Sequence, residues 1–168
     1  QVQGIDYFEV FSPTMQIKSL RTLLALHSGN AMVLSESWDV SAAFLFADIH
    51  EELYAKQPQG HVDPLNKTKV WRLRKALYEI RQAARAWEKT MNAGMVAVGF
   101  IQSNNDACLY IRKRRKKFHT RCRSHRRFLS FSQRHKTSNQ NFNALNAKYI
   151  LKRGALEHFL GMLVTRDH

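Results

Sequence analysis

Cysteine, proline and long apolar runs are scarce in this chain of 168 residues. Its two cysteines, Cys108 and Cys122, have a spacing that indicates neither a disulfide framework nor a cysteine-based zinc ribbon. The longest apolar runs are far shorter than the roughly 20 residues that span a bilayer. The chain does not open with a charged segment followed by an apolar one, as secretory signal peptides do. We therefore expect no membrane contact and an intracellular location, either cytoplasmic or nuclear.

Acidic residues are also few, since 13 Asp and Glu stand against 27 Lys and Arg and give a net charge of +14. This balance favours a polyanionic partner, and nucleic acid is the usual one. The imbalance lies in one stretch, because no acidic residue occurs between Asp106 and Glu157. The basic side chains that we expect to contact nucleic acid are Arg112, Lys113, Arg114, Arg115, Lys116, Lys117, Arg126 and Arg127.

Apolar residues make up 44% of the chain, which is enough for one domain with a core. Hydrophobic periodicity predicts helices over residues 13–27, 81–98 and 142–149, and strands over residues 32–38, 52–56, 70–73, 108–111 and 158–164. In the second helix, the spacing of Trp87 and Met91 is typical of core packing. This irregular alternation predicts an α+β fold in which helices pack on a mixed or antiparallel sheet.

Several short motifs follow one another along the chain. They are Trp38-Asp39-Val40-Ser41-Ala42-Ala43-Phe44-Leu45, Gln57-Pro58-Gln59-Gly60, Leu77-Tyr78-Glu79-Ile80-Arg81-Gln82 with Trp87, Asp106-Ala107-Cys108-Leu109-Tyr110, and Phe159-Leu160-Gly161-Met162. In this order, they resemble the reverse transcriptase of copia-type LTR retrotransposons, a part of the Pol polyprotein. The resemblance runs from Gly4 to about Lys113 and resumes from about Phe142 to Asp167. It implies one partial domain over residues 1–168, made of part of the fingers and most of the palm of a right-hand polymerase.

The resemblance also implies an active site. Nucleotide addition uses two divalent cations, Mg²⁺ or Mn²⁺, held by carboxylates. The metal-binding aspartate of the family matches Asp39, the aromatic residue that excludes a 2′-hydroxyl matches Phe44, and the glutamine that borders the nucleotide pocket matches Gln82. The implied partner is an RNA or DNA template-primer. Without the surrounding motifs, an aspartate after an apolar run is more often the cap of a turn than a metal ligand.

The chain departs from the family pattern at the residues that the chemistry needs. Glu79 replaces a glycine, Phe46-Ala47 stands in place of an Asn-Gly turn, and the upstream Lys-Ala-Arg-Leu-Val-Ala-Lys-Gly fingers strand is not part of this sequence. The Tyr-x-Asp-Asp hairpin, expected between Ile111 and Phe142, is missing. We therefore predict a disrupted catalytic hairpin, no metal bound at Asp39 alone, and a chain that is a polymerase by descent without the activity.

The genetic code offers an explanation for the missing hairpin. His125-Arg126-Arg127-Phe128 can be encoded CAT CGA CGA TTT, and one nucleotide forward this reads ATC GAC GAT, or Ile-Asp-Asp. If Ser124 is TCA, the preceding codon reads His. We hypothesise that residues 112–141 are a basic, out-of-frame segment, with a second shift before Phe142. Because such a stretch lacks the alternation of a central strand, we expect it to be disordered or poorly packed.

Two alternatives remain. The chain can be a non-enzymatic, basic nucleic-acid-binding protein that uses residues 112–136 on phosphates. His119, Cys122, His125 and His135 are of zinc-ligating types, but their spacing fits no common zinc pattern. A hydrolase has no support, because no nucleophile with a paired base is recognisable.

Overall fold

The computed structural model describes residues 1–29, 35–114, 117–124, 126–132, 135–155 and 157–164. The chain forms two compact units: the first comprises Gln1–Ser12 and Phe44–Thr90, and the second comprises Pro13–Ala43 and Met91–His168. The sequence predicts one partial domain, and each of these units is described by itself. Within the described part of the chain, every helix is too short or too polar to cross a membrane.

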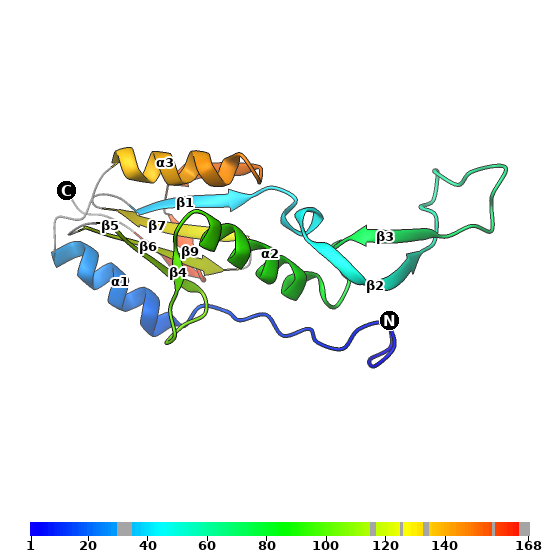
Figure 1. The fold of residues 1–168 in the computed structure, drawn as a ribbon, viewed down its shortest axis with the longest axis horizontal. Helices are drawn as coiled ribbons and strands as arrows, with labels where there is room; N and C mark the ends of the chain where they lie inside the picture. The colour runs from blue at the N-terminus through cyan, green and yellow to red at the C-terminus, as the bar shows by residue number, and fades with distance from the viewer. Residues whose placement is uncertain (30–34, 115–116, 125, 133–134, 156, 165–168) are drawn as a thin grey trace. The chain divides into compact units, whose positions relative to one another are not determined.

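The second unit is built on a six-stranded sheet in the order β4-β5-β6-β7-β1-β8 (Figure 1). The strands are β4 (Ile101–Gln102), β5 (Leu109–Arg114), β6 (Lys117–Ser124), β7 (Arg127–Ser132), β1 (Ser35–Val40) and β8 (Leu151–Ala155). Each neighbouring pair is antiparallel. The early strand β1 is therefore inserted between two late ones, and its residues lie opposite residues about 90 or more positions later in the sequence, such as Asp39 opposite Arg127.

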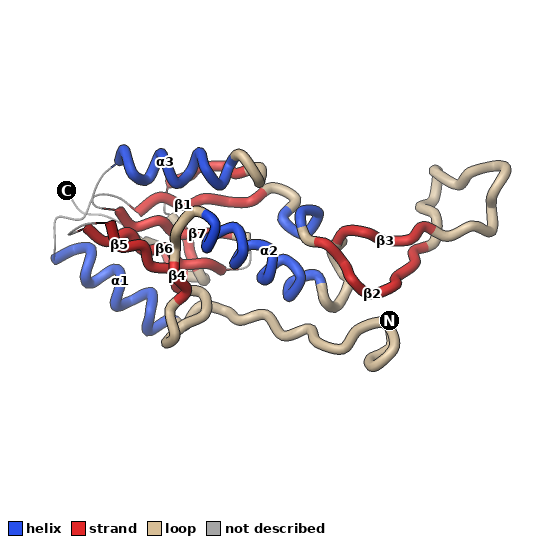
Figure 2. Tube along the Cα trace, in the orientation of Figure 1, coloured by secondary structure: helices blue, strands red, loops and turns tan. Residues whose placement is uncertain are grey.

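Helices α1 (Ile17–Gly29) and α3 (His135–Asn146) cover opposite faces of this sheet (Figures 1 and 2). On the α1 side, the core contains Met15, Leu20, Cys108, Leu129, Phe131 and Phe159. Leu20, Leu23 and Leu24 recur at helical spacing, which gives α1 the apolar face that packs there. Phe159 belongs to a small hairpin of β9 (His158–Phe159) and β10 (Met162–Leu163).

The α3 side of the sheet is held by aromatic and polar contacts. Trp38 on β1 meets Phe142 edge to face, with ring centroids 5.1 Å apart. Ser138 Oγ donates a hydrogen bond to Glu36 Oε2 at 3.0 Å, and Arg112 Nη1 donates one to Asn141 Oδ1 at 2.7 Å. These contacts fix α3 on β1 and β5.

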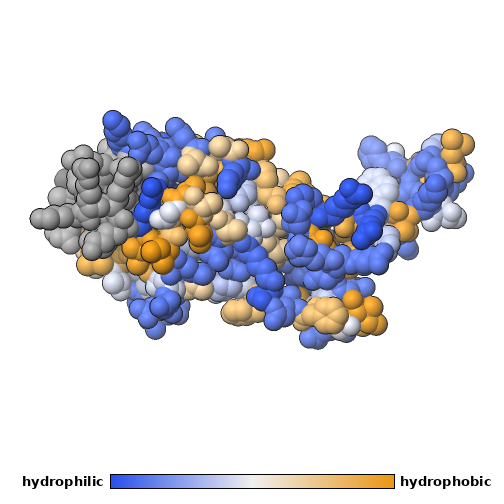
Figure 3. Space-filling view, in the orientation of Figure 1, coloured by the Kyte–Doolittle hydropathy of each residue, from blue (hydrophilic) through white to orange (hydrophobic). Residues whose placement is uncertain are grey.

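The first unit contains the antiparallel pair β2 (Asp48–Ala55) and β3 (Trp71–Lys75). Gln57 organises the loop between them, because its amide donates to Asn66 O at 2.7 Å and to Lys69 O at 2.9 Å. The short helix η1 (Ala43–Phe46) precedes β2, and α2 (Ala83–Ala97) begins in this unit. In the space-filling view, apolar residues form small groups on a mainly hydrophilic face (Figure 3).

Most predicted elements agree with the structure, and the α+β class with an antiparallel sheet is one of them. The single strand predicted over residues 158–164 is wrong, because the chain turns between β9 and β10. At that turn, Leu160 and Gly161 have φ angles of 50° and 76°, which an extended strand does not contain. The last predicted helix is also longer at its start, since α3 begins at His135 rather than near Phe142.

The basic segment differs most from the expectation of a disordered or poorly packed stretch. Residues 117–124 and 127–132 pair as β6 and β7. The physical reason lies in β7, where Phe128, Leu129 and Phe131 are buried on the two faces of the sheet. Residues 115, 116, 125, 133 and 134 of this segment lie outside the described residues.

We expect Leu129→Ala to lower the free energy of unfolding by about 2–5 kcal/mol, because Leu129 is 0% exposed in the α1-side core. Urea unfolding followed by circular dichroism measures this loss. The control is Ile101→Ala, since Ile101 is 74% exposed and its truncation should change stability by about 0.5 kcal/mol or less. An equally small effect of the two substitutions would mean that β7 is not part of a packed core.

Candidate functional site

Asp39 lies near the end of β1, between two basic residues on the neighbouring strands. The register places Arg127 of β7 directly opposite it on one side and Lys152 of β8 on the other. Trp38 and Val40, its neighbours in the chain, are fully buried on the other face of the sheet. The Asp39 carboxylate is 32% exposed. The local alternation of β1 therefore presents one partly exposed carboxylate among cations.

The turn between β6 and β7 brings the two adjacent arginines to this carboxylate. Arg126 Nε lies 3.3 Å and Arg127 Nε 3.8 Å from Asp39 Oδ1. The backbone fixes this approach, since Val40 N donates to Arg126 O at 3.1 Å. No described residue hydrogen-bonds to Asp39 Oδ1, so the attraction is that of ion pairs without good hydrogen-bond alignment.

The residues around Asp39 do not fit a pair of divalent cations. Mg²⁺ and Mn²⁺ sites are built from several oxygen ligands, and a two-metal site needs more than one carboxylate. In the described ranges, no three His, Cys, Asp or Glu side chains lie close enough to hold a metal ion. His125 lies outside the described residues, and the side chains of His119, Cys122 and His135 are not described, so the zinc alternative is not tested.

Two further arginines of the basic segment lie inside the sheet rather than on its surface. Arg121 and Arg123 on β6 are each 1% exposed. The Arg121 guanidinium lies between two rings, with Cζ 3.9 Å from the Trp38 centroid and 4.7 Å from that of Phe100. No described residue hydrogen-bonds to its Nε, Nη1 or Nη2. Burial lowers the pKa of Arg121 well below its usual value, and the nearby Glu36 opposes this shift.

The other predicted nucleic-acid contacts are distributed unevenly. Arg112 is partly buried and bound to Asn141, whereas Arg126 and Arg127 are about half exposed. Arg115 and Lys116 lie outside the described residues, and the side chains of Lys113, Arg114 and Lys117 are not described. Sequence reasoning missed the burial of Arg121 and Arg123, although their alternation around Cys122 is the period of a strand. It also missed Lys152, which only the non-local pairing of β1 with β8 could reveal.

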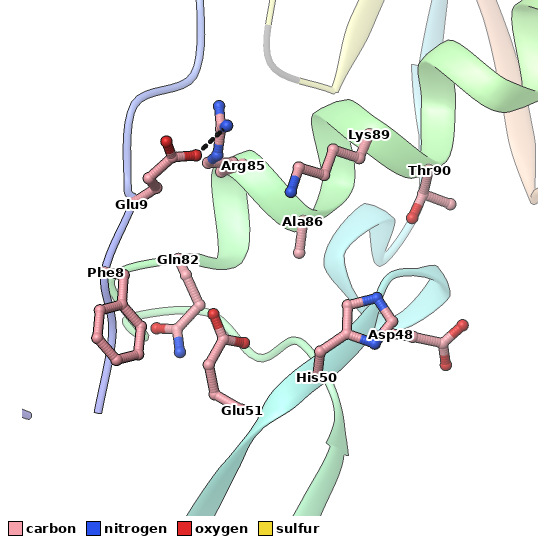
Figure 4. Close-up of a pocket in the computed structure, with 10 residues that line it drawn as sticks. All are labelled: Phe8, Glu9, Asp48, His50, Glu51, Gln82, Arg85, Ala86, Lys89 and Thr90. Carbon is pink, nitrogen blue, oxygen red and sulfur yellow. Dashed lines mark ion pairs between the residues drawn. The ribbon is translucent and has the colours of Figure 1, made fainter. Parts of the chain in front are cut away.

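A cavity of about 290 Å³ lies in the first unit, between the start of α2, strand β2 and the N-terminal segment (Figure 4). Its lining carries both charge signs: Phe8, Glu9, Asp48, His50, Glu51, Gln82, Arg85, Ala86, Lys89 and Thr90. Arg85 forms an ion pair with Glu9, which the figure marks. A hydrogen bond from Lys75, with Nζ 2.7 Å from Oδ1, lowers the pKa of Asp48.

Gln82 is buried beside this cavity and holds the N-terminal segment. Its Nε2 donates to Asp6 O at 3.1 Å, and its Oε1 accepts from Gln1 Nε2 at 3.1 Å. Phe44, which the resemblance assigns to the same nucleotide pocket, is not among the described lining residues. It packs instead against Tyr78, with centroids 4.7 Å apart. Asp39 belongs to the other unit, and a single site of the three residues stays a prediction.

Comparison with known proteins decides the family. A family model described as reverse transcriptase (RNA-dependent DNA polymerase) matches residues 1–167. The chain belongs to this family. The resemblance to copia-type elements is thereby confirmed, because similar curated proteins are Pol polyproteins of such transposons. No solved structure matches this reverse transcriptase chain.

The relatives are much longer than this reverse transcriptase chain. The retrovirus-related Pol polyprotein from transposon TNT 1-94 of Nicotiana tabacum is 35% identical over 113 residues, which is 67% of this chain and 8% of that protein. The corresponding polyprotein from transposon RE2 of Arabidopsis thaliana is 37% identical over 119 residues, 68% of this chain and 8% of that protein. The putative transposon Ty5-1 protein YCL074W of Saccharomyces cerevisiae is 35% identical over 74 residues, 44% of this chain and 24% of that protein.

We expect Gln82→Ala to release the N-terminal segment, because it removes the side chain that contacts both Gln1 and Asp6. The loss of about 1.4 kcal/mol of hydrogen bonding corresponds to about tenfold faster amide exchange in residues 1–12. Hydrogen exchange measured by mass spectrometry tests this. Gln59→Ala, in the exposed loop before β3, is the control and should leave exchange unchanged. Equal exchange in the two variants would show that Gln82 does not hold the segment.

Proposed function

We propose that this chain is a fragment of a copia-type retrotransposon reverse transcriptase that no longer transfers nucleotides. The observation that carries the proposal is the ion pairing of Asp39 with Arg126 and Arg127. In intact members, as the resemblance implies, carboxylates at this place hold Mg²⁺ or Mn²⁺ and polymerise DNA on an RNA template. In this proposal, the chain descends from an RNA-directed DNA polymerase but does not have that activity.

Electrostatics supports the loss of the metal site. Two unit charges about 4 Å apart near a protein surface interact by about 4 kcal/mol. A cation bound at Asp39 gains that attraction from one carboxylate and meets a repulsion of similar size from each arginine. Lys152, directly opposite on β8, adds a third positive charge. Repulsion therefore outweighs attraction, and the arginines themselves occupy the position of the counter-ion.

We assign the two units to parts of a right-hand polymerase on the same grounds. The six-stranded sheet that carries Asp39 corresponds to the palm, and the β2–β3 pair with its loop corresponds to part of the fingers. What supports this is the order of the motifs along the chain and the antiparallel sheet covered by helices. In this assignment, Phe44 and Gln82 are relics of the nucleotide pocket.

With magnesium or manganese and an RNA template, we expect the unaltered chain to extend a primer no more than the Asp39→Asn variant does. Arg126→Asp combined with Arg127→Asp should create Mn²⁺ binding, because it surrounds the position with carboxylates. Isothermal titration calorimetry measures this gain. Arg72→Asp with Arg74→Asp, on exposed positions of β3, makes the same charge change elsewhere and should bind no Mn²⁺. Extension that Asp39→Asn abolishes, or Mn²⁺ binding by the unaltered chain at Asp39, would overturn the proposal.

A second candidate is non-specific nucleic-acid binding without catalysis. The observation that favours it is the exposure of Arg126 and Arg127, at 47% and 53%, beside the exposed Lys152. Three cations at the end of one sheet suit a phosphate backbone, which releases counterions when it binds.

This candidate predicts steep salt dependence. On duplex DNA, the slope of log affinity against log salt should be about −0.9 for each phosphate neutralised. Arg126→Gln with Arg127→Gln should make the slope shallower by about one to two contacts, and fluorescence anisotropy at several salt concentrations measures it. The matched control, Arg72→Gln with Arg74→Gln, should keep the slope. The same slope in both variants would place any binding elsewhere on the chain.

A further inference from the structure

Strand β6 carries arginines where a central strand carries apolar side chains. It lies between β5 and β7 in the sheet. Arg121 and Arg123 are nearly inaccessible to solvent, and no described residue hydrogen-bonds to the Arg121 guanidinium. Stacking between Trp38 and Phe100 compensates only part of the cost of removing that charge from water. Apolar residues would therefore suit positions 121 and 123 of this fold better than the arginines that this sequence has there.

The genetic code connects these cations to apolar residues. Every arginine codon has G as its middle base. A reading displaced one nucleotide forward therefore begins each of these codons with G and encodes Val, Ala, Asp, Glu or Gly. The two cysteine codons, TGT and TGC, become Val or Ala whatever base follows. Arg121-Cys122-Arg123 encoded CGT TGT CGT, followed by A or T, then reads Val-Val-Val.

We propose that the displaced reading covers β6 from Phe118 to its end, together with residues 125–127, and that the buried arginines are displaced valine or alanine codons. With Ser124 encoded AGT, residues 118–127 can be TTT CAT ACT CGT TGT CGT AGT CAT CGA CGA. One nucleotide forward, with the first base of Phe128, this is Phe-Ile-Leu-Val-Val-Val-Val-Ile-Asp-Asp. The inference rests on the proposed function, and it assigns particular codons to β6 within the out-of-frame segment hypothesised for residues 112–141.

This displaced sequence suits the environment of the sheet at two separate sets of positions. It puts small apolar residues at Arg121 and Arg123, where the α3-side core excludes water. It also puts carboxylates at Arg126 and Arg127, which contact Asp39. A backward displacement can give neither Val nor Asp, because CGN codons then read Ser, Pro, Thr or Ala, and AGA or AGG codons read Gln, Lys, Glu or stop. Only the forward frame can encode valine at the buried positions together with aspartate at positions 126 and 127.

The deciding experiment is the nucleotide sequence of the gene and of its transcript across codons 112–142. The expected result is that the forward frame encodes Val or Ala at positions 121, 122 and 123, followed by Asp at 126 and 127. Any other reading of these five codons, such as a stop, Gly or Asp at 121 or 123, overturns the inference. If the forward frame does not encode these residues and the chain still binds no Mn²⁺, the proposed loss of function stands. Only its explanation by a displaced reading frame is then wrong.

A protein experiment tests the same inference without the gene. Arg121→Val with Arg123→Val should raise the Tm of the full chain by at least about 3 °C, because it replaces buried cations with apolar side chains. Arg126→Val with Arg127→Val, at exposed positions, is the matched control and should shift the Tm by no more than about 1 °C. Arg121→Met with Arg123→Met keeps more of the side-chain volume, so it controls for a loss of stability caused by a cavity around the smaller valines. A lower Tm in both buried pairs would overturn the inference.

Discussion

The antiparallel pairing of β1 with β7 is the constraint on which the rest of the second unit depends. This ladder joins Ser35 with Phe131 and Asp39 with Arg127. The buried apolar residues Phe128, Leu129 and Phe131 help to set the register, and the backbone hydrogen bonds of the ladder then form whatever side chains the remaining positions carry. Whatever residues occupy positions 126 and 127 therefore meet Asp39. The same geometry that could gather carboxylates around a metal gathers arginines around a lone aspartate here.

A sheet can tolerate this exchange of side chains at an exposed strand end more easily than in its buried core. Arg126 and Arg127 remain half in water, where a favourable pairing with Asp39 costs little and contributes little. Arg121 has no such option, since its charged group lies between Trp38 and Phe100. We therefore expect the basic segment to affect the stability of the core more than the surface.

Local pattern was sufficient for elements whose apolar spacing is regular. Trp87, Met91 and Met95 predict α2, and all three are buried. The strand predicted over residues 32–38 corresponds to β1 (Ser35–Val40), which in the structure also includes Asp39. Strand β6 could not be found this way, because its buried positions are cationic. The neighbours of Asp39 could not be found either, since they come from strands about 90 or more residues later. The resemblance supplied the family and the candidate residues, whereas the surroundings of Asp39 required the register.

The packing of the sheet also explains how a chain with arginines at positions 126 and 127 keeps β6 and β7 paired. In β7, Phe128, Leu129 and Phe131 provide the apolar contacts that hold the hairpin on both faces, and β5 and β1 supply ladder partners on either side. Arginine stems are themselves apolar, so β6 fills space in the core even though no described residue hydrogen-bonds to the Arg121 guanidinium. The fold depends on the backbone and apolar groups of these strands, whereas the proposed loss of chemistry depends on which charged groups positions 126 and 127 present to Asp39.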